Sequence, residues 1–218
     1  MSLVDRIVAR LLRRRYPTPL QYWEDRVRTY GPRSVLHVAH ANEDMEEITR
    51  MQEREIFPHF RSQLNGHEKV VLDFGCGPGR FTVQLAKIIH GEAIGLDPMR
   101  ELLRKAPESP NVSYWNVRSK RLPFADNSVD VIWCCLVMGG IAEPEETIFE
   151  LCRVLRPNGL MFLVENTSDR PNGGFWKYRS VDHYIALFAF AKLVQLHDYV
   201  DVGERISIMA GRKSEFLS

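Results

Sequence analysis

The segment from Lys69 to Arg80 constrains this chain more than any other part of its sequence. Residues 70–72 form a short apolar, mostly β-branched run of the kind that is buried in a parallel sheet. Three alternating glycines interrupt this run, and a helical pattern follows whose apolar face carries Phe81, Leu85, Ile88 and Ile89. The segment therefore predicts a strand, a glycine turn and a helix, which is the first half of a βαβ unit.

The spacing of the glycines limits the ligand that such a turn could bind. They stand at Gly75, Gly77 and Gly79, one residue too short for the G-x-G-x-x-G fingerprint of dinucleotide-binding proteins. No Gly-Lys-Ser/Thr follows, so a phosphate-binding P-loop is excluded. A glycine turn that serves only the fold is the remaining alternative at this point, because such turns are weak signals on their own.

The stretch from Val71 to Gly79 resembles motif I of the class I S-adenosylmethionine-dependent methyltransferases, in which an acid precedes G-x-G-x-G. The acid here is Asp73. The resemblance implies that S-adenosylmethionine is the cofactor, and that this loop contacts it through Asp73, Phe74, Gly75, Cys76, Gly77 and Gly79.

A second strand is expected at residues 92–97, ending in Asp97. A carboxylate at the end of the second strand can accept both hydroxyl groups of a ribose, and Asp97 matches the family's ribose-binding acid. Pro98 and Met99 would then lie beside the adenine. The alternative for Asp97 is a helix cap, since Asp before Pro can also start a helix.

The third strand is expected at residues 111–117, and here the chain departs from the family. Many members place an acid or amide after this strand to bond the adenine amino group, but this chain has Arg118. The nearest alternatives for that contact are the Asn116 side chain and a backbone group of Val117.

The segment from Leu122 to Trp133 resembles the family's Leu-Pro-Phe turn and fourth strand. Asp130 lies at the wrong end of this strand for a ligand, so we expect a structural role for it. The other end of the strand should face the methyl-transfer centre, with Cys134 against the cofactor. Gly140 stands where many members carry a histidine, which predicts more space for the substrate.

A third match to the family runs from Glu150 to Gly159, where a helix should end before a fifth strand at residues 160–164. Two final strands are expected at 191–201 and 205–212. The resemblance thus implies an α/β, Rossmann-like sheet of seven strands in the order 3-2-1-4-5-7-6, with the last strand antiparallel. An aromatic and basic insertion at residues 175–179 is placed where the family usually builds substrate specificity.

Residues 1–64 are expected to form a helical arm and lid, and residues 65–218 the cofactor-binding domain. A helix should run from about Glu43 to Phe57 and end at Pro58. Residues 3–15 form a basic amphipathic pattern, which favours packing on protein over peripheral contact with a membrane.

The composition predicts a protein of the cytosol. The 218 residues carry a formal net charge of +1, which gives no general attraction to nucleic acid. Apolar runs are too short to span a membrane, and no secretory signal is apparent. The four cysteines, Cys76, Cys134, Cys135 and Cys152, form no C-x-x-C pair, so we expect reduced thiols and no metal site.

The expected reaction is methyl transfer to an oxygen or nitrogen of a small molecule, driven mainly by proximity and orientation. If a base is needed, the candidates are Glu165, His183 and His40. The alternatives are a binding module without catalysis and an enzyme acting on a lipid-linked or glycan acceptor. A nicotinamide oxidoreductase is disfavoured by the glycine spacing, and the sequence does not predict the oligomeric state.

Overall fold

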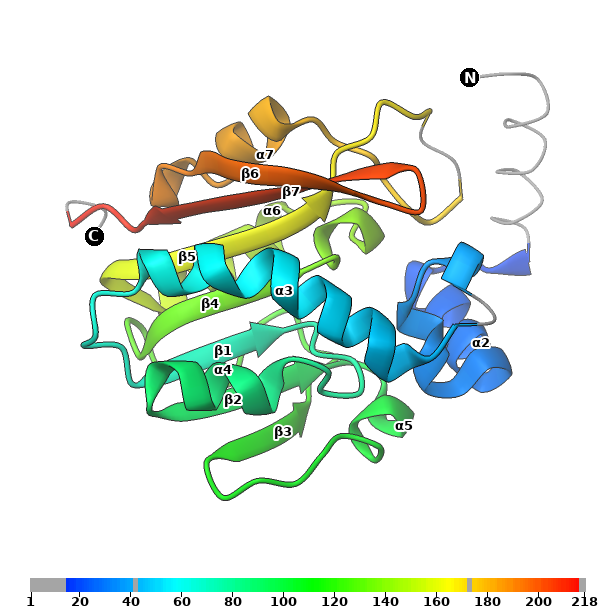
Figure 1. Cartoon of the computed structure of the whole chain (residues 1–218), viewed down its shortest axis with the longest axis horizontal. Coiled ribbons are helices and arrows are strands. Elements are labelled where there is room, and N and C mark those ends of the chain that lie inside the picture. The colour runs from blue at the N-terminus through cyan, green and yellow to red at the C-terminus, as the bar shows by residue number, and fades with distance from the viewer. Residues whose placement is uncertain (1–14, 41–42, 172–173, 216–218) are drawn as a thin grey trace.

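The computed structural model describes residues 15–40, 43–171 and 174–215. Its centre is one seven-stranded sheet in the order β3-β2-β1-β4-β5-β7-β6 (Figure 1). Neighbouring strands are parallel except at β7, which runs antiparallel to both β5 and β6. The predicted fold class and strand order are confirmed. The strands are β1 (Val70–Phe74), β2 (Glu92–Asp97), β3 (Val112–Asn116), β4 (Val129–Cys135), β5 (Leu155–Asn166), β6 (Val194–Asp201) and β7 (Glu204–Arg212).

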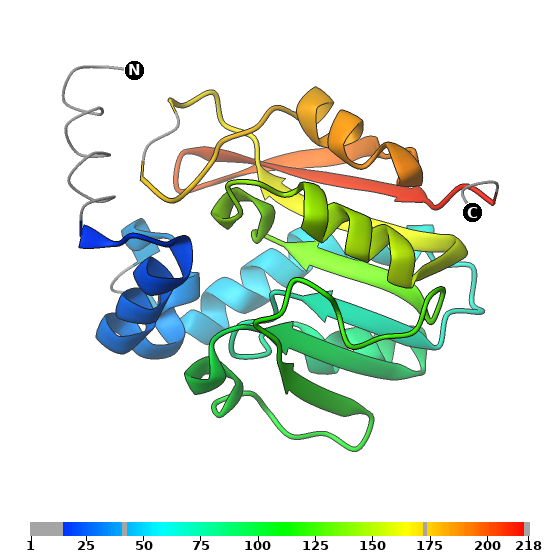
Figure 2. The ribbon, with the colours of Figure 1, turned by 180° about the vertical axis from the view of Figure 1, so that it is seen from behind.

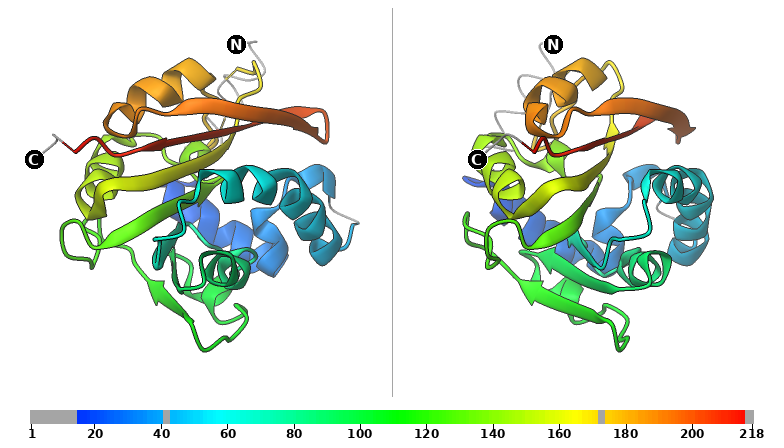
Figure 3. Two further views of the ribbon diagram at one scale, coloured as in Figure 1. Left: turned by 60° about the vertical axis from the view of Figure 1, so that its left-hand side comes forward. Right: turned by 90° about the vertical axis from the view of Figure 1, so that its left-hand side faces the viewer.

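Helices cover both faces of this sheet (Figures 1, 2 and 3). On one face, α3 (Met45–Gln63) and α4 (Thr82–Ile89) bury apolar side chains around Trp133. On the other face, α6 (Glu145–Val154) and α7 (Val181–Leu187) enclose a second apolar cluster. The shorter elements are α2 (Pro19–Tyr30), α5 (Arg100–Leu103), and the 3₁₀ turns η1 (Gly31–Val35), η2 (Val38–His40), η3 (Met138–Gly140) and η4 (Ala189–Ala191).

The parallel strands point toward α2, so the carboxyl edge of the sheet faces the N-terminal helices (Figure 1). Thr18 caps α2 in a capping box with Gln21, and Pro19 occupies the first turn, where its missing N–H does not matter. The Arg26 guanidinium then donates to the carbonyl oxygens of Ser34 and Leu36, which folds η1 back onto α2. These segments together with η2, here called the N-terminal unit, cover the edge where open α/β sheets bind their ligands.

The helix expected to end at Pro58 continues to Gln63, so that boundary was wrong. Proline removes one hydrogen bond of the helix, yet the last turn carries Phe60, which is fully buried against Trp133 and Phe162. Burying an aromatic ring of this size offsets the missing bond. Helix α3, expected as part of the N-terminal arm, therefore packs in the main core.

Two further boundaries differ from the prediction. Strand β5 begins at Leu155 instead of residue 160, because Leu155 already pairs with Val129, and residues 156–159 form an irregularity before the ladder resumes. The first strand of the final hairpin begins at Val194, and the turn consists of Val202 and Gly203 alone, with φ of 46° and 77°. Positive φ at both central positions is the geometry that favours tight hairpins.

The basic pattern at residues 3–15 lies, apart from Arg15, outside the described residues. Among the helices that the structure does describe, none is sufficiently long and apolar to cross a membrane.

Candidate functional site

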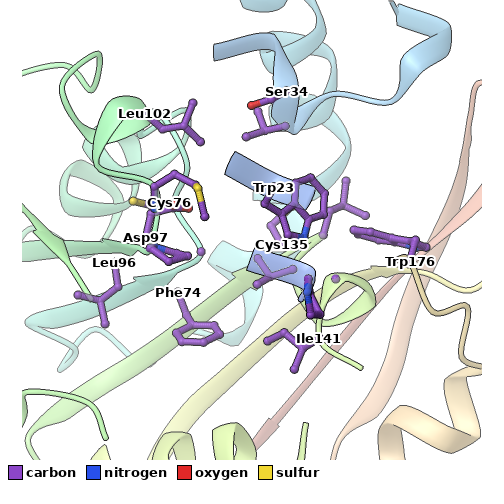
Figure 4. A pocket seen from close by; sticks show the side chains of 18 of the residues that line it. Trp23, Ser34, Phe74, Cys76, Leu96, Asp97, Leu102, Cys135, Ile141 and Trp176 are labelled. Atoms are coloured by element: carbon purple, nitrogen blue, oxygen red, sulfur yellow. Dashed lines mark hydrogen bonds between the residues drawn. The ribbon is translucent and has the colours of Figure 1, made fainter. Parts of the chain in front are cut away.

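A cavity of about 580 Å³ lies between the carboxyl edge of the sheet and the N-terminal helices. That volume is within the range of small-molecule sites. In Figure 4, Asp97 and Cys76 lie at one side of the cavity, Trp176 at the other, and Trp23 between them. The cavity is thus a single space that extends from the glycine loop after β1 to the final hairpin.

The glycine loop adopts backbone conformations that favour glycine, and side chains of the protein pack against it. Gly75, Gly77 and Gly79 all have φ between 56° and 75°, a backbone conformation that residues other than glycine rarely adopt. A Cβ on Gly75 would lie 2.4 Å from a methyl carbon of Val137, and one on Gly77 would lie 2.9 Å from Val35. The loop is held by the N–H groups of Gly75 and Cys76, which donate to the carbonyl oxygen of Leu96.

Asp97 lies at the end of β2, on the wall of the cavity. One of its carboxylate oxygens accepts the N–H of Gly77 at 2.9 Å, and the other accepts the N–H of Met99 at 2.7 Å. Each oxygen retains a lone pair for a further donor. Burial raises the pKa of Asp97 to about 6, although both backbone bonds favour the ionised form.

Asp73, in β1, is the second buried acid of this region. The Thr82 hydroxyl donates to its carboxylate at 2.6 Å. Burial raises the pKa of Asp73 to about 7, and the Thr82 bond only partly opposes this. Burial also raises the pKa of the Cys76 thiol well above its ordinary value, which leaves that thiol protonated and unreactive.

Most of the predicted cofactor residues line the cavity, and the others lie close behind its wall. The lining set contains Asp73, Phe74, Gly75, Cys76, Asp97, Pro98, Met99 and Val117. Gly77 and Gly79 complete the loop beneath it. Asn116 donates its side-chain amide to the carbonyl oxygen of Asp97 at 3.0 Å and lies outside the lining.

Cys134 is fully buried in the core on the α6 side of the sheet. Side chains alternate along a strand, so the next residue, Cys135, reaches the cavity instead.

The prediction that Gly140 leaves more space for a substrate was wrong. The indole ring of Trp23 occupies that space, 3.3 Å from where a Cβ on Gly140 would be. Gly139 makes a similar approach to Trp176, with a hypothetical Cβ only 2.2 Å from that ring. The two glycines thus admit two tryptophans, one from α2 and one from the insertion.

The three candidate bases lie outside the cavity lining. Glu165 is fully buried, and its carboxylate accepts the backbone N–H groups of Val137, Met138 and Gly139. It thereby fixes the loop after β4. Burial raises the pKa of Glu165 to about 7.

The two candidate histidines have different surroundings. His183 is exposed on α7, where its backbone N–H is capped by Ser180. His40 is buried in η2, and its Nε2 lies 2.9 Å from Asp201. His40 therefore ties the N-terminal unit to the final hairpin.

Several cavity residues were not expected from the sequence. They come from separate segments, with no local pattern connecting them, and are Gln52, Arg80, Asp201 and Glu204. Arg118, noted as a departure from the family, also lines the cavity. It forms an ion pair with Glu24 of α2.

Comparison with known proteins agrees with this geometry. The family described as "Methyltransferase domain" matches residues 72–163. An uncharacterized methyltransferase of Schizosaccharomyces pombe is 36% identical over 108 residues, which cover 44% of this chain and 39% of the relative. The ubiquinone/menaquinone biosynthesis C-methyltransferase UbiE of Yersinia pestis is 28% identical over 143 residues, covering 60% of this chain and 57% of the relative.

Among solved structures, a putative sarcosine dimethylglycine methyltransferase from Galdieria sulphuraria superposes with a TM-score of 0.68. The match covers 88% of this chain and 99% of that one, at 16% identity, and so describes a shared fold. The chain spans 39% and 57% of the two curated relatives described above.

The motifs, the sheet order and the family match over residues 72–163 make this chain similar to the class I S-adenosylmethionine-dependent methyltransferases. The cofactor of this family is S-adenosylmethionine, and the cavity fits such a molecule. Asp97 presents a buried carboxylate to hydroxyl groups, Gly75 of the glycine loop lines the cavity, and Phe74, Leu96 and Met99 offer apolar surface to a flat ring.

Proposed function

We propose that this chain transfers the methyl group of S-adenosylmethionine to an oxygen or nitrogen atom of a small-molecule acceptor. The observation that carries the proposal is the continuous cavity, because it joins the predicted cofactor residues to a second polar region at Asn166 and Glu204. The cofactor supplies a methyl group already activated on a sulfonium. The protein then has to bind both molecules, align them and exclude water.

The cofactor end of the cavity is proposed to hold S-adenosylmethionine through side chains already in place. Asp97 would accept the ribose hydroxyls, since its oxygens are fixed by the backbone of Gly77 and Met99. The apolar surface of Met99 and Phe74 would receive the adenine. Asp73 and the glycine loop would face the remainder of the molecule.

Catalysis is proposed to depend on position more than on a dedicated base. Glu165 accepts three backbone N–H groups, and His183 is exposed on α7, outside the cavity lining. Effective molarity from holding two reactants in line can lower a barrier by about 7–11 kcal/mol.

A small acceptor is supported by the size of the site. Trp23 and Trp176 line a cavity of about 580 Å³, a volume suited to a small molecule and not to a duplex. A lipid-linked acceptor is the second candidate, because the relative UbiE is named for ubiquinone and menaquinone biosynthesis. Its name also describes carbon methylation, so the acceptor atom has to be tested directly.

Calorimetry with S-adenosylhomocysteine tests the first half of the proposal. We expect micromolar binding by the wild type and much weaker binding by Asp97→Ala. A screen of oxygen and nitrogen acceptors with methyl-labelled cofactor tests the second half. Binding without transfer to any acceptor would favour a non-catalytic module, whereas absence of binding would overturn the proposal.

A further inference from the structure

The far end of the cavity lies over different strands from the cofactor residues. Asp97 ends β2 and Asp73 is the last residue but one of β1, whereas Asn166 ends β5 and Glu204 begins β7 on the same edge of the sheet. Three strand spacings separate β1 from β7, which places Glu204 about 14 Å from the glycine-loop strand. This distance leaves room for an acceptor beside the bound cofactor.

Glu204 is the most enclosed acid at this end. Its side chain is only 3% exposed, yet it lines the cavity. Asn166 donates its amide to one carboxylate oxygen, and the Tyr178 hydroxyl lies 3.5 Å from the other. A buried carboxylate is costly unless a positive charge compensates it.

The neighbouring charged groups interact with one another and not with Glu204. Arg80 donates to the side-chain oxygen of Gln52, whose amide donates to Asp201 at 3.2 Å. His40 contacts the second oxygen of Asp201. Arg80, Gln52, Asp201 and His40 thus form one chain in which the guanidinium offsets the carboxylate.

The cation nearest to Glu204 comes from the protein surface. Arg170 lies in the polar loop after β5, is about half exposed, and reaches the carboxylate at 3.1 Å. His37, from the N-terminal unit, lies at 3.8 Å. An exposed arginine can leave a carboxylate at little cost, because water solvates its charge. The place it occupies is accessible to another cation.

Aromatic rings line the same cavity. Trp23 and Trp176 approach edge to face, with ring centroids 6.5 Å apart, and Tyr178, which contacts Glu204, adds a third ring to the lining. The faces of indole and phenol rings attract cations. A cavity that holds a buried carboxylate next to Tyr178, and that two tryptophans also line, suits an ammonium group.

We propose that this end of the cavity binds an acceptor that carries a protonated or quaternary amine, with Glu204 as the residue that selects it. The ammonium group takes the place of the Arg170 guanidinium against Glu204 and lies beside Trp23 and Trp176. This inference rests on the proposed methyl transfer and specifies the chemical class of its acceptor.

The test compares two molecules of the same shape, choline and its uncharged isostere 3,3-dimethylbutanol, on the complex with S-adenosylhomocysteine. Calorimetry should show choline binding at least about ten-fold more tightly than the isostere. In Glu204→Gln, which keeps the size of the side chain and one acceptor oxygen but removes the charge, the preference should disappear. Affinity for S-adenosylhomocysteine should remain unchanged.

Arg170→Ala is the matched variant, and its expected effect on choline affinity is opposite to that of Glu204→Gln. Since Arg170 is half exposed, its removal should leave the fold intact and strengthen choline binding severalfold. Equal binding of the two molecules, no choline binding at about 10 mM, or an unchanged preference in Glu204→Gln would overturn the inference. Loss of S-adenosylhomocysteine binding by the wild type would instead overturn the proposed function.

Discussion

The two ends of the cavity hold their buried acids in different ways. At the cofactor end, Asp73 and Asp97 are bonded to neutral donors, and burial raises the pKa of both. At the other end, Asp201 and Glu204 contact His40 and Arg170. The first pair is poised for a ligand that brings donors to it, whereas the second pair is already satisfied and must exchange a partner to bind one.

The largest effect is expected from neutralising Asp73. Its pKa, raised from 3.8 to about 7, means that ionisation of Asp73 opposes folding. The contribution of Asp73 to the free energy of unfolding is complete below pH 4 and is lost as the pH rises through 7. It amounts to about 4 kcal/mol at most. Asp73→Asn should therefore be more stable than the wild type at pH 8, by denaturant unfolding without cofactor, and equal to it at pH 4.

Asp130→Asn is the control for this measurement. Asp130 accepts the N–H groups of Lys69 and Val70 and pairs with Arg156, so removing its charge should not stabilise the chain at pH 8. A stability difference for Asp73→Asn that did not vary with pH would contradict the account of Asp73.

The second effect is on cofactor binding. Asp97→Ala removes a carboxylate proposed to accept two hydroxyl groups, which should weaken S-adenosylhomocysteine binding by about 100-fold, or about 3 kcal/mol. Glu204→Gln, at the other end of the cavity, should change that affinity less than about two-fold. If both variants lost affinity equally, the division of the cavity into two ends would be wrong.

The cofactor end could be predicted because its parts are local in sequence. Asp73 and the three glycines occupy one short segment, and Asp97 ends the next strand. A turn with no room for a Cβ and an acid at a strand end follow directly from such patterns. The strand order was predicted from the resemblance, and the structure confirmed that order.

The other end could not be predicted because its contacts join distant segments. Asp201 meets His40, and Glu204 meets Asn166 and Arg170, only after the hairpin has packed beside β5. The error at Gly140 has the same origin. No pattern near Gly140 indicates that Trp23, more than a hundred residues earlier, fills the space beside it.

A third, smaller effect is expected from overpacking beside Trp176, which should affect the acceptor end of the cavity and not the cofactor end. In Gly139→Ala, the new methyl group would lie 2.2 Å from the Trp176 ring, which must move. Overpacking of this kind costs about 1–3 kcal/mol. Thermal stability and acceptor turnover should fall while S-adenosylhomocysteine affinity is retained. Gly140→Ala, whose methyl would lie 3.3 Å from Trp23, is the matched milder variant, and a larger loss for it than for Gly139→Ala would contradict the geometry.

The smallest effect concerns the ion pair between Glu24 of α2 and Arg118 after β3. This pair connects the N-terminal unit to the cofactor end, but its side chains are 35% and 51% exposed. Water and salt therefore screen it, and a double-mutant cycle with Glu24→Gln and Arg118→Met should give a coupling of about 0.5 kcal/mol that decreases with added salt. Arg118 also donates to the carbonyl oxygen of Pro98 at 3.2 Å, so the Arg118 single variant should lose more stability than the Glu24 single variant.

A coupling above about 2 kcal/mol, insensitive to salt, would show that the pair is desolvated in solution. The N-terminal unit would then be held at the cofactor end by charge, in addition to the packing of Val35 on Gly77.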